Sequence, residues 1–117
     1  MFINLTNHPS ENWSEEQIQA AHYYGEIVDL SFPIIEPAYS KQEILYLVKE
    51  CTEVIMGIKE EKTVVHVMGE MTFTYNIVCA LKELDIICIA STTERNTIMT
   101  PDGKKISEFK FVQFREY

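Results

Sequence analysis

Three short polar segments of the sequence hold the side chains that could take part in chemistry. Residues 6–10, 69–72 and 91–96 contain hydroxyl groups, an imidazole and a guanidinium. Backbone N–H groups and hydroxyls stabilise negative charge, and an arginine adds a two-pronged contact that suits a phosphate. The chemistry that these segments favour is therefore the binding of a phosphate or another anion.

His8 is the residue of these segments best suited to move a proton, because an imidazole titrates near neutral pH. An idle surface histidine would fit the same position equally well. His66 differs, since it stands within an apolar run and is typical of a packed, hydrogen-bonded core residue. The pattern assigns no role to His22.

The other polar residues also have ordinary structural explanations. Asn7 and Ser10 are common turn residues, and Gly69 could simply permit a turn between a strand and a helix. Arg95 could pair with a surface acid such as Glu94. The functional interpretation gains weight only if all three segments meet at one place in the fold.

The spacings that mark metal and cofactor sites are absent from the sequence. There is no HxH, HExxH or DxD motif, so Glu70, Glu94 and His8 make a poor metal site. The glycine-rich fingerprints of dinucleotide-binding and P-loop proteins are missing as well. No Ser-His-Asp or Cys-His arrangement stands out. We therefore expect neither a metal nor a cofactor.

The elements that would position the polar segments follow from the apolar patterns. Two helices begin at capping-box sequences, Ser14 with Gln17 and Ser40 with Glu43, and a third follows Gly69. Because the carboxyl ends of parallel strands lie at one edge of a sheet, the polar segments would meet there. The predicted strands cover residues 2–6, 26–32, 63–68 and 86–90, and the first two helices cover residues 14–24 and 40–59.

The end of the chain has the pattern of a β-hairpin. Residues 97–99 and 106–114 flank the turn sequence Pro101-Asp102-Gly103. Together with the alternation of strands and helices, this predicts the fold class α/β. We expect one small Rossmann-like domain over residues 1–117, with a mainly parallel sheet, helices on both faces and a C-terminal hairpin.

The composition is that of an ordinary globular domain, with 117 residues, 46% hydrophobic and 24% charged. A net charge of −8 argues against binding of a long nucleic acid. There is no apolar run long enough to cross a membrane, and no signal peptide is visible. Three well-separated cysteines predict neither a disulfide framework nor a zinc site, so a cytoplasmic protein is expected.

Several strings of this sequence resemble a small CRISPR-associated family of stand-alone Rossmann-like proteins, which are similar to the CARF sensor domains of type III CRISPR systems. The resemblance spans nearly the whole chain. It implies a cytoplasmic homodimer that binds, and could cleave, a cyclic oligoadenylate second messenger as a ring nuclease in antiviral defence. The strings are NLTNHPS at residues 4–10, GEIVDL at 25–30, VMGEMTF at 67–73, STTER at 91–95 and FVQFREY at 111–117.

The resemblance also suggests roles for single residues. Metal-independent cleavage would use the 2′-oxygen of the ligand as nucleophile, with His8 moving the proton and Arg95 holding phosphate. A lysine near the scissile phosphate would help, yet the three segments contain none. The candidate ligand-binding residues are Thr6, Asn7, Ser10, Gly69, Glu70, Met71, Thr72, Ser91, Thr92, Thr93 and Glu94.

Two other functions are compatible with the same residues. A protein that only binds the messenger, as a sensor or a sponge, needs the same donors without any catalytic group. An adaptor protein would instead use the polar segments to dock a protein partner.

Overall fold

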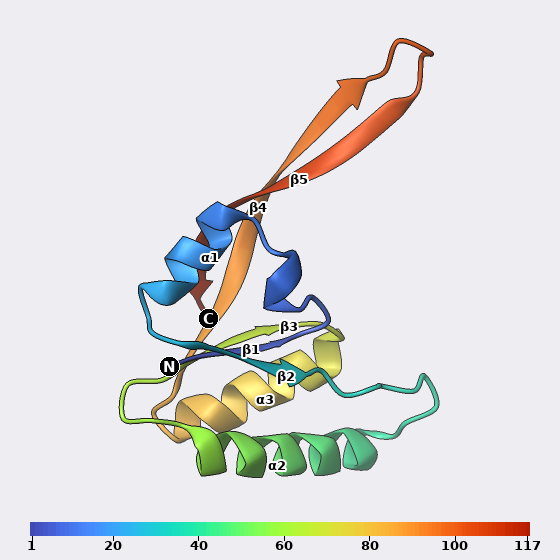
Figure 1. Cartoon of the computed structure of the whole chain (residues 1–117). Coiled ribbons are helices and arrows are strands. Elements are labelled where there is room, and N and C mark those ends of the chain that lie inside the picture. The colour runs from blue at the N-terminus through green and yellow to red at the C-terminus, as the bar shows by residue number, and fades with distance from the viewer.

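A five-stranded sheet forms the frame of the molecule, and the computed structural model describes all of residues 1–117 (Figure 1). Four strands are parallel, and the last strand pairs antiparallel with the fourth. The strands are β1 (Phe2–Thr6), β2 (Ile27–Ser31), β3 (Val64–Met68), β4 (Ile87–Met99) and β5 (Lys105–Glu116), and their order across the sheet is β2-β1-β3-β4-β5. The predicted α/β class, with its mainly parallel sheet and terminal hairpin, is confirmed.

Three helices connect the parallel strands, namely α1 (Glu15–His22), α2 (Lys41–Ile58) and α3 (Met71–Glu83). The predicted caps start the first two, because Ser14 Oγ accepts a hydrogen bond from the Gln17 backbone N–H and Ser40 Oγ accepts one from that of Glu43, both at 3.2 Å. A short 3₁₀ turn, Ser10–Asn12, precedes α1. None of these helices is both long and apolar enough to cross a membrane.

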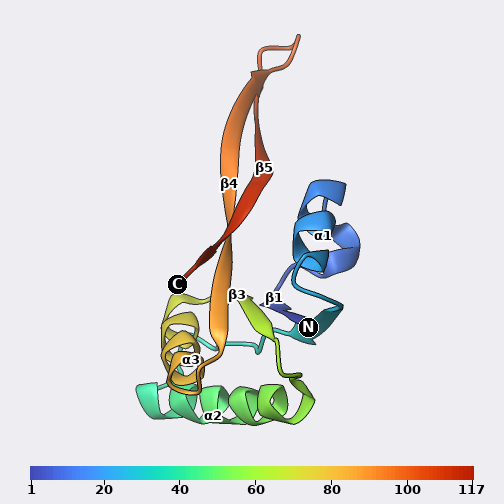
Figure 2. The same cartoon turned by 90° about the vertical axis from the view of Figure 1, so that its left-hand side faces the viewer.

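The helices cover both faces of the sheet unequally. α2 and α3 lie side by side on one face, while α1 lies alone on the other (Figure 2). Side chains alternate along β1, so Ile3 and Leu5 belong to the large core under α2 and α3. Phe2 belongs to the small cluster on the α1 face. The polar residues Asn4 and Thr6 have the same parity as Phe2 and are also buried.

The fourth strand is much longer than the predicted residues 86–90, so the polar segment 91–96 lies within the strand and not in a loop after it. β4 continues from Ile87 to Met99 and pairs with β5 from Ile89 outward. Thr92, Thr93 and Thr97 favour extended backbone, and β5 satisfies the backbone N–H and C=O groups that a loop would leave to water. The outer half of this hairpin projects well away from the helices (Figures 1 and 2).

A β-bulge in this hairpin explains the imperfect alternation of its aromatic residues. Thr92 pairs with Gln113 and Thr93 pairs with Phe111, so Val112 is the additional residue in β5. Residues three positions apart in a regular strand point to opposite faces. The extra residue places the rings of Phe111 and Phe114 on the same face of the sheet instead. The rings of Phe111 and Phe114 consequently lie 4.9 Å apart, between their centroids.

Candidate functional site

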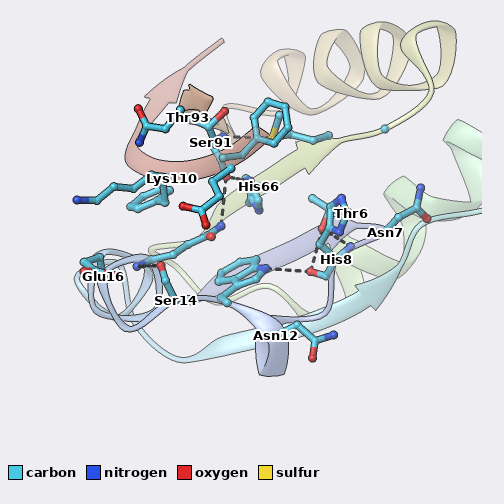
Figure 3. Close-up of a pocket in the computed structure, with 18 residues that line it drawn as sticks. Thr6, Asn7, His8, Asn12, Ser14, Glu16, His66, Ser91, Thr93 and Lys110 are labelled. Atoms are coloured by element: carbon cyan, nitrogen blue, oxygen red, sulfur yellow. Dashed lines mark hydrogen bonds between the residues drawn. The ribbon is translucent and has the colours of Figure 1, made fainter. Parts of the chain in front are cut away.

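An open pocket of about 980 Å³ lies at the carboxyl edge of the sheet, where β1 and β3 end beside the base of the hairpin (Figure 3). The strand order reverses between β1 and β3, and ligands of open α/β sheets bind at such a point. The residues that line the pocket are Thr6, Asn7, His8, Asn12, Trp13, Ser14, Glu16, Gln17, His66, Met68, Gly69, Ser91, Thr93, Asn96, Glu108, Phe109, Lys110 and Phe111.

The pocket brings together residues from all three polar segments. The candidates that line it are Thr6, Asn7, His8, Gly69, Ser91 and Thr93. The ends of β1 and β3 and the middle of β4, which are far apart in the sequence, therefore contribute to one cavity. The remaining candidates lie outside its lining, namely Ser10, Glu70, Met71, Thr72, Thr92, Glu94 and Arg95.

Several of the candidates outside the pocket have structural partners instead. Ser10 Oγ donates a hydrogen bond of 2.7 Å to Asp29. The Arg95 guanidinium donates to Ser107 Oγ on the facing strand, at 3.1 Å from one terminal nitrogen. Both side chains are thus engaged in holding neighbouring segments together.

Glu70 is the N-cap of α3 and accepts hydrogen bonds from the first turn of that helix. Its carboxylate receives the backbone N–H of Thr72 at 3.0 Å and that of Phe73 at 2.8 Å. The bond from Phe73, followed by those from Thr72, lowers the pKa of Glu70 below its usual value. Two of the backbone donors that could have held an anion here are therefore already bound to a carboxylate of the chain itself.

Sequence reasoning missed the part of the pocket that the hairpin supplies. Lys110 lines it, so a lysine is present although the three polar segments contain none. Phe109 and Phe111 come from the same strand, and Trp13 comes from the segment before α1. No local signal could reveal the three residues of β5, because only the pairing of β5 with β4 brings them to the ends of β1 and β3.

A chain of hydrogen bonds crosses the four parallel strands beneath this pocket. Asp29 of β2 accepts from Asn4 Nδ2 of β1 at 2.8 Å. Asn4 Oδ1 lies 3.0 Å from Nδ1 of His66 on β3, and His66 Nε2 lies 2.7 Å from the Ser91 hydroxyl on β4. The chain thus runs from an exposed carboxylate at the sheet edge to a hydroxyl in the pocket, and Figure 3 shows its last two members, His66 and Ser91.

The partners of Asn4 determine which nitrogen of His66 carries the proton. The amide nitrogen of Asn4 donates to Asp29 and to the backbone carbonyl of His8, and both partners only accept. The amide oxygen of Asn4, which also accepts from the Thr6 hydroxyl at 2.9 Å, must therefore face His66, and an oxygen that can only accept requires a proton on the ring nitrogen 3.0 Å away. Nδ1 of His66 consequently holds the proton, so Nε2 of the neutral ring accepts from Ser91 Oγ.

Burial keeps His66 neutral. Its side chain is 2% exposed, and rings of Phe2, Trp13 and Phe114 surround it with centroids 5.2–5.7 Å away. Desolvation, with a smaller repulsion from His8, lowers the pKa of His66 to about 4. Burial alone would raise the pKa of Asp29, but hydrogen bonds from Asn4 and Ser10 lower it, so its carboxyl is charged at neutral pH.

Two members of this hydrogen-bond chain could be recognised from the sequence. Asn4 and His66 are polar residues in the middle of apolar strands, and such residues require hydrogen-bond partners once they are buried. Which partners they find depends on the register of the strands.

No cluster of three or more His, Cys, Asp or Glu side chains is arranged to hold a metal ion.

The strand order and the position of the pocket define this molecule as a Rossmann-like α/β protein with a polar site at the carboxyl edge of its central strands. The chain belongs to the family described as Uncharacterized protein MJ1673, whose model matches residues 1–115. No curated protein and no solved structure matches the chain.

Proposed function

We propose that this protein binds a cyclic oligoadenylate in the pocket at the carboxyl edge of the sheet and cleaves it as a ring nuclease without a metal ion. The observation that carries the proposal is the convergence of polar strand ends, aromatic rings and Lys110 on one cavity. The resemblance of residues 4–10, 67–73 and 91–95 to a CRISPR-associated, CARF-like family supplies the identity of the ligand.

The lining of the pocket suits the parts of such a ligand. Adenine bases stack on aromatic rings, and Trp13, Phe109 and Phe111 offer three of them. Asn7 and Thr93 can hydrogen-bond the ribose hydroxyls. A single cation such as Lys110 suffices for one phosphate, and this reconciles an anionic ligand with the net charge of −8.

The proposed reaction is an internal transesterification. The ribose 2′-oxygen attacks the adjacent phosphorus, the bond from phosphorus to the 5′-oxygen breaks, and a 2′,3′-cyclic phosphate and a 5′-hydroxyl result. The 2′-hydroxyl proton leaves through His8, which can return it to the 5′-oxygen. Lys110 stabilises the charge that develops on the phosphate oxygens.

Incubation of the purified protein with cyclic tetra- and hexa-adenylate, with and without EDTA, tests this proposal. Linear products in both conditions indicate a metal-independent nuclease. A shift in ligand mobility without products would favour a sensor or a sponge. If neither change occurs, the adaptor function gains support and the proposal fails.

Two matched substitutions in the hairpin test the assignment of the cation. Lys110→Ala and Arg95→Ala each remove one positive charge, but only Lys110 lines the pocket. We expect Lys110→Ala to weaken ligand binding by about tenfold or more, since a charge-assisted contact is lost. Arg95→Ala should change the affinity by less than about threefold. Calorimetry measures both affinities. A larger loss of affinity for Arg95→Ala than for Lys110→Ala would assign the phosphate contact to Arg95 instead.

His8→Ala tests the proton transfer separately. The rate of cleavage should fall by roughly 10²-fold or more while the affinity stays nearly unchanged, because His8 would act only in the chemical step. Single-turnover kinetics with saturating protein measures this rate. Unchanged cleavage would remove His8 from the mechanism without affecting the binding proposal.

The homodimer is a further part of the proposal. Apolar side chains of the hairpin, namely Ile98, Met99, Ile106 and Phe109, are each close to half exposed or more. A second copy of the chain could cover them. Light scattering coupled to gel filtration should give a mass near twice 13.6 kDa. A mass of one chain at micromolar concentration would contradict the dimer.

A further inference from the structure

We propose that Ser91, His66 and Asn4 form a nucleophile, its base and the group that orients the base, and that Ser91 can be covalently phosphorylated or acylated by an ester bound in the pocket. This activity is separate from attack by a ligand's own 2′-oxygen. It goes beyond the function proposed above, and its test does not depend on a cyclic oligoadenylate.

The distances are those of an activated hydroxyl. Ser91 Oγ lies 2.7 Å from His66 Nε2, and His66 Nδ1 lies 3.0 Å from Asn4 Oδ1. Activated nucleophiles have this arrangement, in which a base within hydrogen-bond distance is itself oriented by a third group. Ser91 and His66 both line the pocket, so an electrophile can approach the hydroxyl.

The tautomer of His66 is the one that this chemistry needs. Asn4 holds the Nδ1–H, which leaves the lone pair of Nε2 free to accept the hydroxyl proton of Ser91. Asp29 fixes the amide of Asn4 in turn. Its charge lies beyond Asn4 on the side away from Ser91, and it favours the imidazolium that forms during the reaction.

Thr93 provides a useful contrast within the same pocket. It is also a hydroxyl residue of β4 that lines the cavity, but no histidine nitrogen lies within hydrogen-bond distance of it. A hydroxyl without an adjacent base is a weak nucleophile near neutral pH. Reactivity caused by the pocket alone should therefore be shared by Thr93, whereas activation by His66 should be confined to Ser91.

The covalent step balances without any further reactant. Ser91 Oγ forms a bond to the phosphorus or carbonyl carbon of the ester, and its proton moves to His66 Nε2. The bond from that centre to the leaving oxygen breaks, and the leaving oxygen takes the proton from His66. Gln17 Nε2 donates a hydrogen bond to Ser91 Oγ at 3.3 Å, so the hydroxyl proton of Ser91 remains directed at His66 Nε2.

Diisopropyl fluorophosphate tests the nucleophile directly, with fluoride as the leaving group. We expect one adduct on the native protein, located at Ser91 by peptide mass spectrometry. General-base activation typically contributes 10² to 10⁴, so Ser91 should react at least about 100-fold faster than Ser10 in the same molecule. Ser10 is the internal control, since its hydroxyl bonds a carboxylate and no imidazole.

Variants then separate activation from simple access. Ser91→Ala should abolish the adduct, Thr97→Ala, farther along β4 and outside the pocket lining, should leave it unchanged, and His66→Gln should slow it by about 100-fold or more. If His66→Gln does not fold, nitrogen NMR of the native protein decides, since the proposal requires the proton on Nδ1 of His66. A proton on Nε2, or an adduct that forms equally fast at Ser10 or Thr93, would overturn the proposal. p-Nitrophenyl acetate as a second probe shows whether carbon esters acylate Ser91 as well as phosphorus esters do.

Discussion

His66 illustrates at the scale of one residue how a polar group is kept inside an apolar sheet. Three aromatic rings exclude water from the imidazole, and Asn4 and Ser91 satisfy its two nitrogens. A buried neutral imidazole with both hydrogen-bond partners present costs little folding free energy. The protonated imidazole would be poorly solvated at the same place. Protonation of His66 is therefore linked to unfolding.

The stability of the protein should consequently fall in mild acid. Between about pH 6.5 and pH 4, the unfolded chain binds a proton at His66 that the folded chain does not bind. The free energy of unfolding should decrease as the pH falls through this window, by at most about 3 kcal/mol. Urea unfolding at several pH values measures the change.

The control for this prediction is a second histidine. His66→Gln should flatten the dependence between pH 4 and 6.5, while His22→Gln on helix α1 should leave it in place. Asp29 does not obscure the result, because its pKa is lowered from 3.8 and its own contribution is lost only at lower pH. An equal slope in the wild type and in His66→Gln would contradict the linkage.

At the scale of the element, the side chain of Glu70 determines what the N-terminus of α3 can bind. Glu70 was a candidate for ligand binding, but its carboxylate accepts two backbone N–H groups of the first turn. Ligands that bind at helix N-termini use the same donors. The cap thus stabilises the helix and reduces its capacity to hold an anion.

Removal of this cap should destabilise the protein. Glu70→Ala leaves the N–H groups of Thr72 and Phe73 without their acceptor and should lower the free energy of unfolding by about 1 kcal/mol. Glu83→Ala is the matched control at the other end of α3, where an acidic residue opposes the helix dipole. Thermal unfolding of both variants provides the comparison, and similar losses in the two would contradict the role of Glu70.

The whole molecule is elongated because the hairpin extends past the layered body. Its principal extents are 50 × 37 × 21 Å, and its radius of gyration is 16.0 Å, where a compact chain of 100 residues has about 13 Å. The inner part of the hairpin contacts α1 and lines the pocket, but the outer part consists of two strands alone. A two-stranded ribbon without a covering layer is only marginally stable.

Hydrogen exchange should therefore divide the molecule into two parts. Amides of the outer hairpin, at residues 95–99 and 105–109, should exchange much faster than those of β1 and β3, which open only with global unfolding. Exchange followed by NMR at two protein concentrations also tests the dimer, since a second copy that covers the hairpin would slow exchange as concentration rises. Equal protection of the hairpin and β1 in a monomeric sample would contradict the prediction.

Local patterns in the sequence determined most of the framework. Apolar runs, two capping boxes and a turn sequence predicted the four parallel strands, the helices and the hairpin, because these features depend on neighbouring residues. The same patterns placed residues 6–8 and Gly69 at strand ends. The predicted length of β4 was wrong, because threonine-rich polar segments occur both in loops and in edge strands. Only the pairing with β5 determines that this segment is a strand.

The tertiary structure alone decided which residues share the site. Lys110 and Phe109 reach the pocket through the register of a hairpin, and Ser91 meets His66 through the order of strands across the sheet. The hydrogen bonds of the chain from Asp29 to Ser91 join residues that are 25 or 62 positions apart, so no short spacing in the sequence encodes them. A parallel sheet aligns side chains across strands, and the alignment exists only once the strands have paired.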